Sequence, residues 1–180
     1  MKKVTRRNLF ETNSSSVHAI VVNKEAEIDL FVDSIVFTPG EYGWQKRTYT
    51  SIQDRASYLW TAILTCSYDS SGLDPEDYYN NRTREWIDYI TNTLKETLTS
   101  LYPSSIKFIW PKTDCISDFY IDHSEDLRDW LDMIHNDKQY LIQYLLGSDS
   151  SIHTGNDNDS DDYPDLPAIN DSSNYSIYRK

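Results

Sequence analysis

The chain has 180 residues, a formal net charge of −12 and a sequence pI near 4.6. This length suits one domain, with or without a tail, and its 5 Trp and 14 Tyr side chains supply large surfaces for a core. Because phosphate neutralisation dominates nucleic-acid binding, a chain this acidic is not expected to bind free DNA or RNA tightly. The charge either serves solubility or predicts a partner with a strongly basic surface, such as a protein that handles nucleic acid.

Several other classes are excluded by pattern. No apolar run approaches the ~20 residues of a membrane span, and no hydrophobic stretch follows the basic residues 2–7, so a signal peptide is not expected. Cys66 and Cys115 lack metal-ligand spacing and are expected to be reduced thiols. There is no phosphate-binding glycine loop. We therefore expect a cytoplasmic protein without a cofactor, a structural metal or a membrane contact.

The expected elements follow one another irregularly along the chain. In order they are strands over 17–22 and 28–37, a turn over 38–44, helices over 51–66 and 74–101, strands over 106–110 and 119–121, helices that begin at 124 and 137, and a strand or turn over 151–158. This order predicts an α+β fold rather than regular βαβ units. We expect a small mixed or antiparallel sheet packed against three to four helices.

We expect one α+β domain over residues 1–158, followed by an acidic, partly disordered tail over residues 159–180. The tail opens with an acidic run and contains Pro164 and Pro167, as a solvated linker would. Near its end, residues 175–178 combine tyrosine, serine and isoleucine in a pattern that can add a short edge strand.

A polar stretch near the start of the chain is its most distinctive feature. Five consecutive hydroxyl or amide side chains, Thr12 to Ser16, lie between Glu11 and His18. Such side chains compete for backbone hydrogen bonds in a helix interior, so the stretch predicts a turn leading into strand 17–22. A plain polar turn beside a surface histidine is the simplest interpretation. Likewise, the turn over 38–44 is either a binding loop or a plain turn that displays Glu41 and packs an aromatic ring.

Three segments pair a histidine with acids, amides or hydroxyls at the end of an apolar strand. They are Glu11…His18, Asp122-His123-Ser124, and His153 with Asn156 and Asp157. If these ends meet at one sheet edge, two or three histidines would support general acid–base catalysis near neutral pH. RNA cleavage suits such a site, because a base removes the 2′-OH proton and an acid protonates the leaving 5′-oxygen. Our candidate site comprises His18 and His123 as acid and base, with Glu11, Asn13, Ser14, Ser15, Ser16, Asp122, His153 and Asp157 as further members.

Two other chemistries use the same residues. One is a divalent metal site formed by His18, Asp122, His123 and Asp157, but no short ligand spacing such as H-x-x-x-H is present. A serine nucleophile among residues 14–16 lacks the G-x-S-x-G context of hydrolases.

Four motifs together resemble a group of small proteins encoded by phages and mobile elements of Gram-positive bacteria. The motifs are residues 7–18, 39–44, 120–124 and 152–158. In length and acidity the chain also resembles the streptococcal type II anti-CRISPR proteins that act on Cas9 by shortening its guide RNA. This resemblance implies a phage-encoded anti-defence protein that inactivates a Cas9–guide RNA complex in the cytoplasm of a bacterial host cell, with RNA as its substrate there. The histidine acid–base chemistry described above would make that cleavage independent of metal. Docking on that basic complex would hold an acidic ribonuclease beside the guide.

Two functions of other classes fit the same sequence. One is a non-catalytic acidic inhibitor that occupies a nucleic-acid-binding groove, and the other is a phage structural or assembly protein. In the latter, the motifs would be buried hydrogen-bond networks that hold turns together.

Overall fold

The computed structural model confirms an α+β architecture. It describes residues 16–28, 33–43, 45–71, 81–101, 106–111, 119–122, 127–156 and 175–179. The described helices are α1 (Ile52–Ser71), α2 (Asn81–Leu101), α3 (Arg128–Asn136) and α4 (Lys138–Leu146). The described strands are β1 (Ser16–Asn23), β2 (Ser34–Val36), β3 (Glu41–Tyr42), β4 (Arg47–Tyr49), β5 (Lys107–Ile109), β6 (Tyr120–Ile121), β7 (Ser151–Asn156) and β8 (Tyr175–Arg179).

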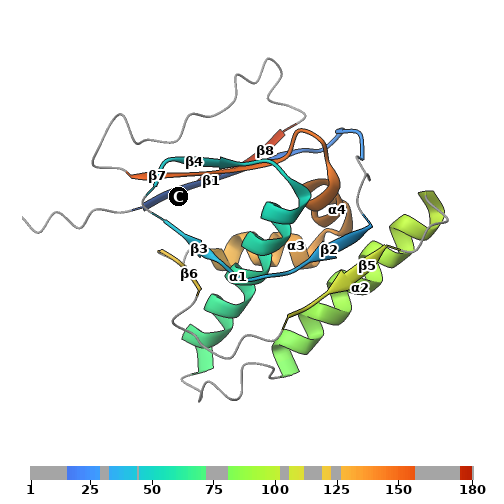
Figure 1. Ribbon diagram of the computed structural model, residues 1–180, viewed down its shortest axis with the longest axis horizontal. Helices are drawn as coiled ribbons and strands as arrows, with labels where there is room; N and C mark the ends of the chain where they lie inside the picture. Colours follow the sequence, from blue (N-terminus) through green and yellow to red (C-terminus); the bar gives the residue numbers. More distant parts are fainter. Residues whose placement is uncertain are drawn as a thin grey trace, which may run out of the picture.

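The main sheet has four strands in the order β4-β7-β1-β8, and each neighbouring pair is antiparallel. Two smaller parallel pairs, β2–β5 and β3–β6, complete the described strands. Figure 1 shows the sheet along one side of the molecule, with α1, α3 and α4 together beneath it and α2 farther away. The main sheet is therefore antiparallel, and the parallel pairing occurs in the two smaller sheets.

The core lies between the main sheet and the helices. Tyr58 of α1, Trp130 of α3 and Tyr144 of α4 are fully buried and meet through edge-to-face ring contacts. The sheet adds Ile20 and Ile152, which face one another across β1 and β7. Helix α2 buries one apolar stripe, formed by Trp86, Ile90, Leu94 and Leu98.

Two predicted helix starts are confirmed by their caps. The Ser51 hydroxyl accepts a hydrogen bond from the Asp54 backbone N–H at 3.0 Å, and the Asp137 carboxylate accepts one from the Tyr140 N–H at 3.0 Å. Helix α1 continues to Ser71 instead of ending near Cys66. The predicted start at Ser124 lies outside the described residues, and α3 is helical from Arg128.

Gly147 follows the last residue of α4, at a position with no room for a side chain. Its φ is −65°, so no left-handed conformation is involved, but a Cβ there would lie 2.5 Å from the Gln143 carbonyl oxygen. We expect Gly147→Ala to lower the free energy of unfolding by about 2 kcal/mol in urea denaturation. Gly40→Ala is the matched control, because its Cβ would meet only the Tyr42 ring, at 3.4 Å. Equal unfolding midpoints for the two variants would contradict this explanation.

The last strand belongs to the main sheet. β8 pairs with β1 in the register Ala19 to Arg179 and Asn23 to Tyr175, so the sheet takes its edge strand from beyond residue 158, where the domain was expected to end. Alternation of tyrosine and isoleucine with polar residues explains why this short segment can pair at an edge. Residues 157–174, which contain the acidic run, lie outside the described residues.

Candidate functional site

Strand pairing brings the four motifs together two by two. β1 carries the first motif and β7 the fourth, with Ser16 opposite Asn156 and His18 opposite Thr154. β3 carries the second motif and β6 the third, with Glu41 opposite Tyr120. Segments more than 70 residues apart in the chain therefore become neighbours in each pair.

Direct contacts then join the two pairs. The Thr154 hydroxyl of β7 donates a hydrogen bond to the Gln45 carbonyl, just after β3, at 2.7 Å. The Tyr42 ring meets the Tyr58 ring edge-on, with centroids 4.9 Å apart, and the Tyr58 hydroxyl lies 3.1 Å from His18 Nδ1. Burial raises the pKa of Tyr42 well above its usual range, so its hydroxyl stays neutral. The described parts of the four motifs are thus linked by strand pairing, by the contacts of Tyr58 with His18 and Tyr42, and by the bond from Thr154 to Gln45.

The two described motif histidines do not converge. His18 lies opposite Thr154 while His153 lies opposite Ala19, so the two imidazoles point to opposite faces of the sheet. His18 is 1% exposed and faces Tyr58 of α1. His153 is also buried, and its ring nitrogens lie 3.2 Å from the Thr48 hydroxyl and 2.8 Å from the Ser151 hydroxyl. The expectation that two or three histidines share one active site is therefore not met by this pair.

The other predicted site residues are placed only in part. Asp122 follows β6, is half-buried, and donates its backbone N–H to the Tyr42 carbonyl at 3.1 Å. Ser16 begins β1 and pairs with Asn156. The remaining predicted members, Glu11, Asn13, Ser14, Ser15, His123 and Asp157, lie outside the described residues.

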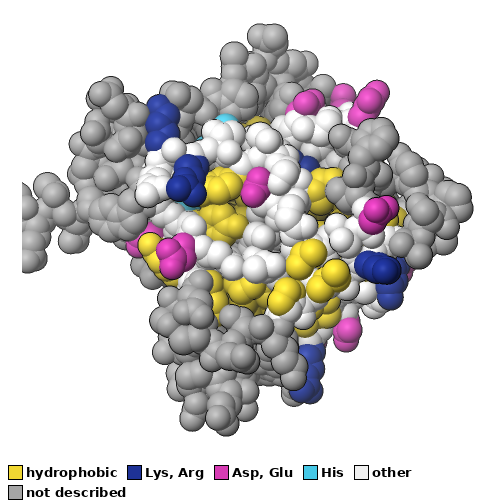
Figure 2. All heavy atoms as spheres, viewed as in Figure 1, with side chains coloured by type: hydrophobic (Ala, Val, Ile, Leu, Met, Phe, Trp, Pro, Cys, Tyr) yellow, Lys and Arg dark blue, Asp and Glu magenta, His cyan; other side chains and the backbone are white. Residues whose placement is uncertain are grey.

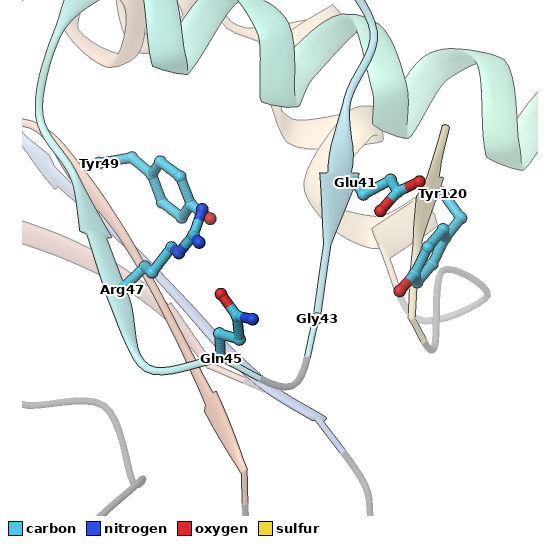
Figure 3. Close-up of a pocket in the computed structure, with 6 residues that line it drawn as sticks. All are labelled: Glu41, Gly43, Gln45, Arg47, Tyr49 and Tyr120. Carbon is cyan, nitrogen blue, oxygen red and sulfur yellow. The ribbon is translucent and has the colours of Figure 1, made fainter. Parts of the chain in front are cut away.

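A pocket of about 270 Å³ opens between β3–β6 and β4. Its walls are Glu41, Gly43, Gln45, Arg47, Tyr49 and Tyr120. Figure 3 shows Gln45, Arg47 and Tyr49 on one side of β3, with the ends of Arg47 and Tyr49 directed into the space between β4 and β3. Glu41 and Tyr120 lie on the other side of β3, where the Glu41 side chain extends toward Tyr120. The second and third motifs thus meet β4 around one hollow.

Sequence reasoning missed the β4 half of this pocket. Arg47 and Tyr49 belong to no motif, and their three-residue strand carries no strong pattern. Their only signal is position, since they directly follow the turn over 38–44. In the sheet, Arg47 lies opposite Thr154, which lies opposite His18, so all three share one face. Because neighbouring strands lie ~4.8 Å apart, the Cα atoms of Arg47 and His18 are about 10 Å apart across β7.

Gly43 lies where the second and third motifs meet at the pocket wall. A Cβ on Gly43 would lie 3.4 Å from the Asp122 Cβ and 3.8 Å from the Tyr120 ring. These are ordinary van der Waals distances, so a small side chain would fit there but would occupy the space between the two motifs. The absence of a side chain at this position therefore leaves that space open.

No family model, curated protein or solved structure matches this chain. The function of the site is therefore inferred from its own residues. Among the described residues, no group of three or more His, Cys, Asp and Glu side chains is arranged to hold a metal ion. Within the same part of the chain, none of the helices combines the length and apolar character needed to cross a membrane.

Proposed function

We propose that this chain is a phage-type anti-defence ribonuclease that cleaves RNA held by a basic host protein. The sequence resemblance implies the Cas9–guide RNA complex as that target. The observation that carries the proposal is the pocket of Figure 3, which places a carboxylate, a guanidinium and two phenol rings around one space. Its volume, about 270 Å³, is near the lower end of the ~300–1,000 Å³ typical of ligand pockets, as suits one nucleotide.

Each wall of the pocket has a role in RNA cleavage. Glu41 is exposed, and its carboxylate would accept the 2′-OH proton. Arg47 is exposed on the opposite wall, and its planar guanidinium would bind the phosphate and stabilise the charge that develops on it. The Tyr49 and Tyr120 rings would hold the flanking bases by stacking, which is how proteins bind unpaired RNA.

The histidines take different parts in this proposal. His18 is buried against Tyr58, and Tyr58 also packs against Tyr42. Tyr42 is next to Glu41 in β3, so His18 would help to position this wall of the pocket through Tyr58. His123 directly follows Asp122 and is three residues after Tyr120, so it remains our candidate for the acid that protonates the leaving oxygen. The proposed reaction needs no metal, because both proton transfers use side chains.

A non-catalytic acidic inhibitor is the second candidate. It is favoured by the net charge of −12 together with the burial of both His18 and His153, which removes two of the predicted catalytic groups from solvent. Figure 2 shows one face of the molecule, on which the described Lys and Arg side chains are scattered around central hydrophobic ones. The described part of that face offers no continuous basic stripe for free RNA, so either candidate needs a basic partner.

A denaturing gel of guide RNA, incubated with this protein in EDTA with and without Cas9, separates the two candidates. We expect a discrete shortened RNA that forms only when Cas9 is present. Intact RNA in both EDTA and magnesium, together with loss of Cas9 activity, would instead establish the non-catalytic inhibitor. Cleavage in magnesium alone would contradict the metal-independent mechanism.

A further inference from the structure

An open groove of about 410 Å³ lies on the surface formed by α3 and α4, outside the candidate site. It is lined by Asp129, Asp132, Met133, Asn136, Asp137 and Tyr140. Its exposed atoms are mainly apolar although half of the lining residues are aspartates. Met133 is 40% exposed and is one of three large hydrophobic side chains that the described part of the chain leaves open to solvent.

The groove follows one face of α3. Asp129, Asp132, Met133 and Asn136 have the i, i+3, i+4, i+7 spacing of a single helix face, and all four are exposed. The opposite face of the same helix buries Trp130, Leu131 and Ile134 in the core. An amphipathic helix normally has one apolar face, so a flexible apolar side chain at the centre of its polar face is suited to contact with another molecule.

We propose that this groove is the docking surface for a basic amphipathic helix of a partner protein. The apolar face of that helix would cover Met133 and the small exposed part of Tyr140, which is otherwise buried, and its Lys or Arg side chains would meet Asp129 and Asp132 at the rim. Helices commonly bind in this way, with apolar anchors in a groove and charges that fix the register. The proposal rests on the proposed function for the class of partner, a basic protein that handles nucleic acid.

Charge selects this occupant over others. An RNA backbone would be repelled by Asp129, Asp132 and Asp137. A second copy of the chain, packed symmetrically on this face, would bring the same carboxylates against one another. Asp137 also caps α4 by accepting the Tyr140 N–H, which leaves Asp129 and Asp132 as the acids available to a partner without loss of the fold.

The test uses a fluorescent synthetic peptide of about 15 residues in which leucines recur at helical spacing and the other positions are mainly lysine. A scrambled peptide of the same composition is the reference, because it has the charge without the amphipathic face. We expect tighter binding of the amphipathic peptide, by anisotropy at low salt. Asp129→Asn/Asp132→Asn and, separately, Met133→Ser should each weaken this binding about tenfold. The matched control Glu85→Gln/Asp88→Asn, on exposed positions of α2, should change it less than twofold.

Equal losses in the α3 and α2 double variants would show attraction to net charge alone and would overturn the proposal. Equal affinity for the two peptides would overturn it as well. So would a wild-type dimer that Met133→Ser converts to a monomer, because a second copy of the chain would then occupy the groove. The same variants are then assayed for RNA shortening with Cas9. Peptide binding without any RNA cleavage by the wild type would overturn the proposed function alone, and cleavage without peptide binding would overturn the docking surface alone.

Discussion

Glu41→Gln is expected to lower the rate of guide RNA cleavage by about 10²–10⁴-fold, the usual contribution of a positioned general base. The amide that replaces the carboxylate has almost the same shape but cannot accept a proton. Because Glu41 is exposed, the variant should unfold within about 2 °C of the wild type. The loss should appear in kcat, measured with Cas9–guide RNA in excess over this protein.

Arg47→Ala should reduce kcat/KM by about 10²-fold, because in the proposed mechanism the guanidinium would bind the phosphate in the ground state and stabilise the developing charge. Arg47→Lys keeps the charge but loses the planar fork, so it should restore only part of the rate. Glu96→Gln and Lys138→Ala are matched controls, since these residues form an exposed ion pair at 2.9 Å between α2 and α4. Wild-type cleavage by both pocket variants would refute the assignment of this pocket.

Much of the fold follows from local physics that a sequence displays. Ser51 and Asp137 predict helix starts, because short polar side chains can accept hydrogen bonds from the first backbone N–H groups of a helix. Both residues are caps in the structure. Residues 17–22 are an uninterrupted apolar stretch apart from His18, and they form the centre of β1. The order of the strands in the sheet could not be predicted in this way, because pairing of β1 with β7 and β8 joins segments more than 125 residues apart. Such pairing depends on tertiary packing, which no local window contains.

The site was less predictable than the fold. The sequence indicated one wall of the pocket, because proline and glycine over 38–44 predict a turn that displays Glu41. Arg47 carries no such signal, since an arginine in a polar stretch is usually a solvated surface residue. The faces of His18 and His153 depend on register, and a shift by one residue would reverse either of them. The apolar pattern identified β1 and part of the expected strand over 28–37, which is β2 over Ser34–Val36, but it missed β3 and β4. Only the pairing shows that the two imidazoles point apart.

Arg55→Ala is expected to lower the free energy of unfolding by about 4 kcal/mol. Arg55 is 2% exposed, and its guanidinium donates to the carbonyl oxygens of Leu145, Thr50 and Ser150. Hydrogen bonds from a charged donor contribute about 1.5–3 kcal/mol each, and truncation removes several of them and leaves a cavity. Urea denaturation measures the loss, and Arg128→Ala, an exposed position on α3, should change stability by no more than about 0.5 kcal/mol.

Arg55→Lys distinguishes the charge from the geometry of this contact. A lysine ammonium keeps the charge but cannot reach three carbonyls in different directions, so we expect about half of the stability loss of Arg55→Ala. Arg55 holds α1 to the segment between α4 and β7, and β7 in turn holds Thr154 against the Gln45 carbonyl at the pocket. At a temperature where Arg55→Lys is fully folded, kcat should equal that of the wild type, because the carbonyls that accept the hydrogen bonds of Arg55 belong to Leu145, Thr50 and Ser150, which do not line the pocket. A lowered kcat in that folded variant would mean that Arg55 also sets the geometry of the pocket.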